Sequence, residues 1–237
     1  MLEKRKAIIL GASSGIGKEI AILLVKENWR VAITGRRKNL LEETVSAFPE
    51  SMLASAFDAR DIAALPHRLA ELVSRLGGLD LFLISAGCGF LNPELALEPE
   101  LQTANTNVLS FTAAAAWAFN HFQKQGHGRL AAITSVGGLI GEGAGPAYPA
   151  SKAYQIMYLD SLRKKAKAEK AGVAITELRP GSVDTQMMKG DGHFWISPPR
   201  KAAELACQAI RQGKKLQYIS RPWSIIGFIL RGSSLFK

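Results

Sequence analysis

The sequence predicts a doubly wound α/β fold, in which about seven parallel strands form a sheet flanked by helices, as a single domain over residues 1–237. Short apolar runs alternate with longer segments of helical period, which is typical of repeated βαβ units. Several runs, such as Leu81–Ile84, are apolar at every position, as strands buried on both faces are. No internal repeat, linker or change of composition marks a second domain.

The strands are placed by their β-branched and aliphatic residues, with segments rich in helix formers between them. The first strand ends in a glycine-rich turn, after which Lys18–Val25 is expected to be helical. The expected strands are Lys6–Leu10, Arg30–Thr34, Ser51–Phe57, Leu79–Ser85, Arg129–Thr134, Val173–Leu178 and Leu216–Ile219.

The composition is that of an ordinary globular protein, with 47% hydrophobic and 21% charged residues. Its two cysteines, Cys88 and Cys207, have no CxxC or metal-ligand spacing, so we expect neither a disulfide nor a metal site. The N-terminus runs into the first strand without a secretory apolar region. We therefore expect a cytoplasmic protein.

The net charge of +10 lies in the last third of the chain. Residues 1–162 carry 15 Lys/Arg and 15 Asp/Glu, whereas residues 163–237 carry 15 and 5. Such an excess attracts anionic membranes or nucleic acids, but no nucleic-acid-binding motif accompanies it, so nucleic acid is not expected. The interpretation we favour for the basic run over residues 163–170 is a solvated helix end, where cations complement the helix dipole.

A glycine-rich turn, G-A-S-S-G-I-G, joins the first strand to the first helix. Glycines let the chain turn tightly and let backbone N–H groups approach a pyrophosphate at the positive end of the helix. An ordinary turn is the alternative, but the position after the first strand favours a dinucleotide site. The residues expected to bind the cofactor here are Gly11, Ser13, Ser14, Gly15, Ile16 and Gly17.

Ser135, Tyr148 and Lys152 give the strongest functional signal. Tyr148 and Lys152 have Y-x-x-x-K spacing, which places both on one helix face, and Ser135 precedes Tyr148 by 13 residues. A surface Tyr–Lys pair is the alternative for this spacing taken alone. A phenol with a pKa of about 10 is a poor base, so we expect Lys152 and oxidised nicotinamide to lower the pKa of Tyr148.

These motifs, with glycine spacing G-x-x-x-G-x-G, resemble those of the short-chain dehydrogenase/reductase family over nearly the whole chain. The resemblance implies a Rossmann-type fold and an NAD(P)(H)-dependent oxidoreductase that moves a hydride between nicotinamide and a carbonyl/alcohol substrate. Tyr148 would transfer the proton, Lys152 would lie near Tyr148 and the ribose, and Ser135 would hydrogen-bond the substrate oxygen. Asn107 would be the helix asparagine that holds a water linking the lysine to solvent, with Asn105 as a competing candidate.

The resemblance also implies further contacts with the cofactor. Ala86 and Gly87 correspond to a turn beneath the adenosine, although the asparagines usual in that turn are absent. Asp58 would contact the adenine, or would cap a helix instead. The segment expected at the nicotinamide end comprises Pro180, Gly181, Val183 and Thr185.

The end of the second strand bears on cofactor preference. An acidic residue there would bind the ribose 2′-hydroxyl and repel a 2′-phosphate. The chain instead has Gly35 followed by Arg36 and Arg37, and Arg36 can pair with a phosphate through its planar fork. We therefore expect NADP(H) to be preferred over NAD(H), with NAD(H) as the alternative cofactor.

Two segments near the C-terminus suggest further features. Residues 186–199 contain methionines and aromatic residues among glycines, so we expect a lid over a partly hydrophobic substrate, with a helix packed permanently on the core as the alternative. Residues 221–237 are apolar and basic, and their apolar run is far below the roughly 20 residues that span a bilayer. They would bind a membrane surface peripherally, a second subunit or the lid.

The resemblance implies a homodimer or homotetramer through helices that begin near Pro99 and Tyr148.

Three classes of function follow from these observations. An oxidoreductase acting on a small carbonyl/alcohol substrate is the main expectation. A non-catalytic dinucleotide-binding regulatory protein would not need Ser135, Tyr148 and Lys152. A peripheral membrane-binding or nucleic-acid-binding protein would use the basic last third, and salt-sensitive binding without turnover would support it.

Overall fold

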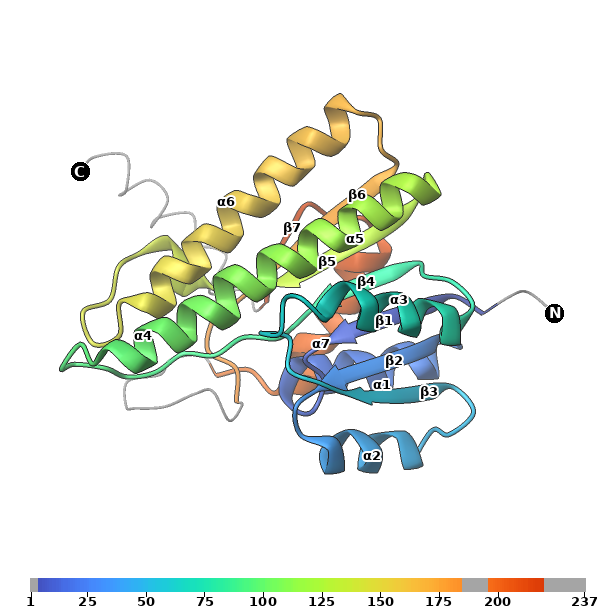
Figure 1. Ribbon diagram of the computed structural model, residues 1–237, viewed down its shortest axis with the longest axis horizontal. Coiled ribbons are helices and arrows are strands. Elements are labelled where there is room, and N and C mark those ends of the chain that lie inside the picture. The colour runs from blue at the N-terminus through green and yellow to red at the C-terminus, as the bar shows by residue number, and fades with distance from the viewer. Residues whose placement is uncertain (1–3, 185–195, 220–237) are drawn as a thin grey trace.

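A parallel sheet forms the centre of the computed structural model, which describes residues 4–184 and 196–219. Within these residues seven strands lie in the order β3-β2-β1-β4-β5-β6-β7, which confirms the predicted doubly wound α/β fold (Figure 1). The strands are β1 (Lys6–Leu10), β2 (Arg30–Gly35), β3 (Met52–Ala56), β4 (Leu81–Ile84), β5 (Gly128–Ile133), β6 (Val173–Pro180) and β7 (Leu216–Ile219).

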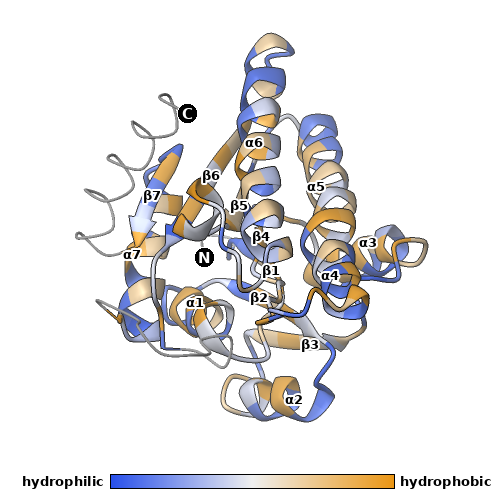
Figure 2. Cartoon of the chain, turned by 90° about the vertical axis from the view of Figure 1, so that its left-hand side faces the viewer, coloured by the Kyte–Doolittle hydropathy of each residue, from blue (hydrophilic) through white to orange (hydrophobic). Residues whose placement is uncertain are grey.

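Helices cover both faces of the sheet (Figure 2). Helices α1, α2 and α7 pack on one face, and α3, α5 and α6 pack on the other. A π-helical turn, Asn105–Ser110, joins α4 to α5, and a short 3₁₀ turn, Val136–Leu139, follows β5. The α-helices are α1 (Gly15–Lys26), α2 (Lys38–Ser46), α3 (Leu65–Leu76), α4 (Leu97–Ala104), α5 (Phe111–Gln125), α6 (Ala147–Ala168) and α7 (Pro199–Arg211).

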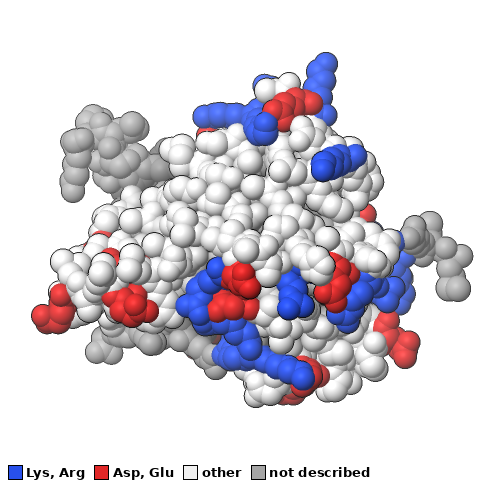
Figure 3. Space-filling view, in the orientation of Figure 1, with Lys and Arg blue, Asp and Glu red and all other residues white. Residues whose placement is uncertain are grey.

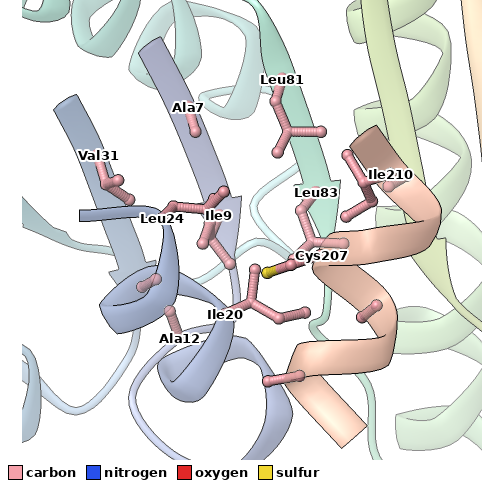
Figure 4. Close-up of a cluster of buried hydrophobic side chains, with 14 of the residues drawn as sticks. Ala7, Ile9, Ala12, Ile20, Leu24, Val31, Leu81, Leu83, Cys207 and Ile210 are labelled. Atoms are coloured by element: carbon pink, nitrogen blue, oxygen red, sulfur yellow. The ribbon is translucent and has the colours of Figure 1, made fainter. Parts of the chain in front are cut away.

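The alternation of side chains along β1 divides the core into two layers. Ala7 and Ile9 point to the face covered by α1 and α7, where they pack with Ile20 and Cys207 (Figure 4). Ile8 belongs to the cluster on the opposite face. Successive residues of a strand point to opposite faces, so a strand covered on both sides needs an apolar residue at every position. This is why the continuous apolar runs in the sequence are central strands.

Several element ends differ from the sequence expectation. Strand β3 is two residues shorter than Ser51–Phe57, and β4 is three residues shorter than Leu79–Ser85. Strand β6 instead continues to Pro180, because its last residues pair with β7. Helix α1 begins at Gly15 rather than Lys18, so the last residues of the glycine-rich turn form the first turn of the helix. Strand ends depend on neighbouring strands, which the local pattern does not contain.

Two lysines of the basic run at the end of α6 pair with acidic side chains on the same segment. Lys164 Nζ lies 2.9 Å from Asp160, and Lys165 pairs with Glu169 one turn ahead. Figure 3 shows acidic and basic side chains together at this end of the molecule. The contacts agree with a solvated helix end, the interpretation favoured from the sequence.

The expected lid and C-terminal segment lie mostly outside the described residues. Thr185 and the greater part of segment 186–199 are not described, and neither is segment 221–237. The end of the expected lid is anchored, because Ser197 forms an isolated parallel bridge with Val183 and Pro199 begins α7. Among residues 4–184 and 196–219, no helix is both long enough and apolar enough to cross a membrane.

Candidate active site

A cavity of about 770 Å³ opens at the carboxyl edge of the sheet. Its walls come from the segments that follow β1, β2, β3, β4, β5 and β6. The chain leaves β1 towards β2 on one side and returns to β4 on the other, so the strand order reverses between β1 and β4. Open α/β sheets bind ligands in the crevice at such a reversal.

Glycines in the turn after β1 are required by close packing. Gly11 has φ +91°, and a Cβ there would lie 2.4 Å from the backbone nitrogen of Ala86. A Cβ on Gly17 would lie 2.3 Å from the carbonyl oxygen of Gly11 and 2.7 Å from Ser85 Oγ. Five of the six turn residues expected to bind the cofactor line the cavity, and Gly17 does not. Gly17 instead lets α1 pack closely against the turn after β4.

The arginines after β2 also line the cavity. Arg37 donates hydrogen bonds to Ser13 Oγ at 2.7 Å and to Ser14 Oγ at 2.6 Å, which joins the end of β2 to the glycine-rich turn. Arg36 is exposed and reaches the same cavity. A Cβ on Gly35 would lie 3.4 Å from Ser13 Oγ, so the end of β2 runs directly beside the glycine-rich turn. The rim therefore carries two guanidinium groups beside the turn.

Asp58 lines the cavity, but its carboxylate is engaged by a residue that the sequence analysis missed. Arg60 donates to Asp58 Oδ2 from Nε at 3.0 Å and from Nη2 at 2.6 Å. These hydrogen bonds from Arg60 lower the pKa of Asp58 below its usual range. Asp58 does not cap α3, because the side chain that accepts from the backbone before this helix is Asp61. Arg60 is the third guanidinium group at this end of the cavity.

Ser135, Tyr148 and Lys152 meet at the opposite end of the cavity. Tyr148 lies in the first turn of α6, and Lys152 lies one turn later with its Nζ 5.8 Å from the centroid of the Tyr148 ring. The side chain of Ser135 interacts with the Tyr148 phenol and lowers its pKa, and Ser135 Oγ accepts from the backbone of Gly137 at 3.0 Å. A Cβ on Gly89 would lie 2.6 Å from Tyr148 Cδ2, so this glycine leaves room for the ring.

The protein's own groups shift the pKa of Tyr148 in the direction opposite to our expectation. Burial raises the pKa of Tyr148, and the carboxylate of Glu142 and the thiol of Cys88 add to the rise, whereas the hydrogen bond with Ser135 lowers it. Desolvation disfavours the charged phenolate, and Lys152 is not among the groups that shift the pKa of Tyr148. Burial also lowers the pKa of Lys152 from 10.5 to about 8. The expected fall in the pKa of Tyr148 included the positive charge of oxidised nicotinamide, and it stays a prediction for the protein with that cofactor bound.

Asn107 lies in the π-helical turn and is fully buried, whereas Asn105 is exposed. The Asn107 side chain accepts from Cys88 N at 2.9 Å and donates to Cys88 O at 2.7 Å, which fixes the loop after β4. It also donates to Ser151 Oγ at 2.9 Å. Of the two asparagines, Asn107 is the one that lies beside the Tyr–Lys pair.

Gln155 connects Asn107 to Lys152, a contact that the sequence analysis missed. Lys152 Nζ donates to Gln155 Oε1 at 3.0 Å and to the carbonyl oxygen of Ile133 at 3.1 Å. Gln155 Nε2 donates to the carbonyl oxygen of Asn107 at 2.8 Å. A glutamine three residues after the lysine gives no recognisable signal in the sequence, because its importance depends on the partners it meets.

The segment expected at the nicotinamide end follows β6. Pro180, Gly181 and Val183 line the cavity, as do Ala86 and Gly87 across from them. A Cβ on Gly87 would lie 3.3 Å from Asn107 Oδ1 and 3.5 Å from Lys152 Nζ, so the turn after β4 passes directly beside both side chains. Thr185 lies outside the described residues.

Comparison with known proteins identifies the family. The short chain dehydrogenase family matches residues 5–193, most of the sequence, and the chain belongs to this family. It is 28% identical over 228 residues to an uncharacterized oxidoreductase of Myxococcus xanthus, covering 93% of this chain and 88% of the relative. It is 29% identical over 224 residues to the ketoacyl reductase HetN of Nostoc, covering 89% and 76%.

Solved structures share the fold. A short-chain dehydrogenase from Streptomyces avermitilis superposes with a TM-score of 0.84 at 20% identity, covering 98% of this chain and 93% of that chain. ElxO with NADP bound superposes with a TM-score of 0.80 at 20% identity, covering 92% and 97%. The chain is thus an oxidoreductase of the short-chain dehydrogenase type with a single Rossmann-like sheet.

Proposed function

We propose that the protein transfers a hydride between NADP(H) and a carbonyl/alcohol substrate, with Tyr148 as the residue that transfers the proton. The observation that carries this proposal is the convergence of Ser135, Tyr148 and Lys152 on the cavity that is also lined by the glycine-rich turn. A regulatory protein that only bound a dinucleotide would need the turn but not this trio.

The residues around the cavity fit a dinucleotide. The turn offers backbone N–H groups at the start of α1, and Gly11 has no room for a Cβ. When bound, the nicotinamide would supply or accept the hydride. The arginines support a preference for NADP(H) over NAD(H), because Arg36 and Arg37 offer a 2′-phosphate two guanidinium groups and the chain has no acidic residue at position 35.

The raised pKa of Tyr148 suits proton donation to a carbonyl substrate. A phenol that stays protonated at neutral pH is the form that can give its proton to a substrate oxygen. Ser135 would donate a hydrogen bond to the same oxygen and stabilise the negative charge that develops there. Lys152 would hold the ribose near Tyr148 with its ammonium group. Oxidation of an alcohol would require the phenolate, which burial disfavours.

Other residues around the cavity would position the cofactor and the loops that hold it. Asn107 would keep the loop after β4 in place, and Asp58 would contact the adenine only together with Arg60, which holds its carboxylate. The nicotinamide end of the cofactor would be held by the segment after β6, at Pro180, Gly181, Val183 and Thr185.

A lid over the substrate would be confined to residues before Ser197, since Ser197 is bridged to Val183. Phe90, Leu91 and Val136 in the cavity wall support a partly hydrophobic substrate.

Exposed apolar residues favour a homo-oligomer. Leu97 is 69% exposed on α4, and Met157 is 65% exposed on the neighbouring helix α6. Leu101 and Leu109 are also exposed on the same helical segment that contains the π-helical turn. Large apolar side chains grouped on one side of a molecule mark a contact surface. We propose that a second copy of the chain covers them.

The proposal is tested with a panel of aldehydes and ketones of increasing apolar size, incubated with NADPH or NADH. Consumption of the reduced cofactor is followed at the nicotinamide absorbance. We expect turnover with NADPH to exceed turnover with NADH at equal concentrations. No oxidation of either cofactor above the buffer rate, while both bind, would favour the regulatory protein.

A further inference from the structure

Gln155 is a buried amide whose two ends meet two groups of the candidate active site. The residue lies on α6 and is 1% exposed. Its Oε1 accepts from Lys152 Nζ at 3.0 Å, and its Nε2 donates to the carbonyl oxygen of Asn107 at 2.8 Å. We propose that Gln155 is a positioning residue that fixes the Lys152 ammonium beneath Tyr148 by tying it to the π-helical turn. The proposal rests on the proposed function for its role in catalysis.

The packing of α6 alone does not account for an amide at this position. A buried amide is unfavourable unless its polar atoms are hydrogen-bonded. Apolar residues fill the neighbouring buried positions Leu159 and Leu162 on the same helix, and an apolar residue at position 155 would need no polar partner. The hydrogen-bond partners of the Gln155 amide are Lys152 and the main-chain carbonyl of Asn107 in the π-helical turn. Turns of this kind are frequent at functional sites.

The hydrogen bonds of Gln155 have a fixed direction, because its oxygen can only accept and its side-chain nitrogen can only donate. The resemblance noted from the sequence implies a water that links the lysine to Asn107. Here a side-chain amide joins the lysine to the Asn107 carbonyl, with an oxygen that only accepts and a nitrogen that only donates. A water can accept one proton and release another, whereas the amide holds its protons. Gln155 therefore stabilises and orients the Lys152 ammonium without passing a proton to the π-helical turn.

The electrostatic environment makes this contact important. Lys152 is 4% exposed, and burial lowers its pKa to about 8. The titratable groups that face it are Tyr148 on its own helix and Cys88 in the loop after β4. In the described part of the chain, the acceptors for its ammonium are the neutral oxygens of Ile133 and Gln155. A hydrogen bond to a charged group stabilises the charged form, so the loss of one acceptor would favour the neutral amine.

The test measures the protonation of Lys152 directly in the full-length protein. The protein is labelled with ¹³C-lysine, and the Cε resonance of Lys152, identified by its absence in Lys152→Met, is titrated by NMR. In Gln155→Met, which keeps the length of the side chain without an amide, we expect about a tenfold loss in the proton affinity of Lys152. In Gln155→Glu, whose carboxylate would face the ammonium, we expect the midpoint to rise. Gln125→Met, which removes an amide from the distant contact with Leu79, is the matched control.

These outcomes distinguish the positioning role of Gln155 from the proposed oxidoreductase activity. Opposite shifts in Gln155→Met and Gln155→Glu, with no shift in Gln125→Met, support the positioning role even if no substrate is turned over. The same midpoint in all four proteins would overturn it. If Gln155→Met does not fold, Gln155→Glu is sufficient for the test. An unchanged titration midpoint of Lys152 in Gln155→Glu would contradict the contact between the two side chains. Where a substrate is known, the alkaline limb of kcat against pH should move in the same directions.

Discussion

Lys152 Nζ lies 5.8 Å from the centroid of the Tyr148 ring, on the same helix and one turn further along. Both side chains reach the cavity, and burial acts on both in ways that favour their neutral forms. The pKa of the phenol is raised and that of the ammonium is lowered. The site therefore holds a protonated phenol beside a cation that is close to losing its charge, an arrangement suited to giving a proton at neutral pH.

The burial of Lys152 predicts a pH-dependent stability. Its pKa is lowered from 10.5 to about 8, so between these pH values the folded state binds fewer protons than the unfolded chain. The free energy of unfolding of the ligand-free protein should therefore rise as the pH increases from about 8 to 10.5. Between pH 7 and 10.5 we expect the wild type to gain up to about 3 kcal/mol of stability relative to Lys152→Met, which lacks the titrating group. Urea unfolding over this pH range measures the difference.

The control for this comparison is Lys164→Met, which changes an exposed lysine of the same helix that pairs with Asp160. Its stability relative to the wild type should not change between pH 8 and 10. A constant difference between Lys152→Met and the wild type over the same range would show that Lys152 keeps its ordinary pKa.

The arginines after β2 predict discrimination between the two cofactors. Arg36→Gln should weaken NADPH binding tenfold or more, because a charge-assisted hydrogen bond to phosphate contributes about 1.5–3 kcal/mol. NADH has no 2′-phosphate, so its affinity should stay within about a factor of two. Fluorescence titration of each cofactor measures this. Arg75→Gln on α3, which pairs with Glu71, serves as the matched control. An equal loss of affinity for NADPH and NADH would refute the phosphate contact.

The contact between Gly89 and the Tyr148 ring predicts an activity that is sensitive to one methyl group. A Cβ on Gly89 would lie 2.6 Å from Tyr148 Cδ2, so Gly89→Ala must displace the ring. A displacement of this size lowers kcat by roughly 100-fold in well-aligned active sites. Gly141→Ala is the control, since nothing lies within 4 Å of its Cβ. If both variants keep wild-type kcat, Tyr148 does not have the position described.

The two cysteines should differ in reactivity. Cys88 is half-buried and lines the cavity, whereas Cys207 is 2% exposed. Burial raises the pKa of Cys207 to about 12, and the thiolate is the reactive form. Iodoacetamide at pH 8 should modify Cys88 first, and NADPH should slow this reaction. Mass spectrometry of the digested protein measures both sites, and faster labelling of Cys207 would contradict the packing of α7 against α1.

The sheet could be predicted from the sequence because the features that mark its strands lie within a few consecutive residues. A strand buried on both faces is apolar at every position, and a glycine-rich turn between strand and helix is visible in seven consecutive residues. Strand ends were less accurate, since Pro180 extends β6 by pairing with Ile219, 39 residues later. The positions of the Tyr–Lys pair also followed from local spacing, because residues four apart share one helix face.

Contacts between distant segments were not predictable in this way. Gln155 and Asn107 are 48 residues apart and meet because the π-helical turn packs on α6. Gly89 is required by the Tyr148 ring, which belongs to another segment. The direction of the Tyr148 pKa shift depends on burial, which only the packed structure determines. The local sequence pattern therefore predicted which side chains meet in the cavity, and the fold shows which groups contact them.

The most direct test of the proposed chemistry is the rate of NADPH oxidation by Tyr148→Phe with the best carbonyl substrate of the panel. Because a phenyl ring has no proton to give, we predict that kcat falls at least about 100-fold. NADPH binding should stay within a factor of about three, since the glycine-rich turn and the arginines are unchanged. Turnover by Tyr148→Phe at the wild-type rate, with the substrate and cofactor bound, would contradict the account.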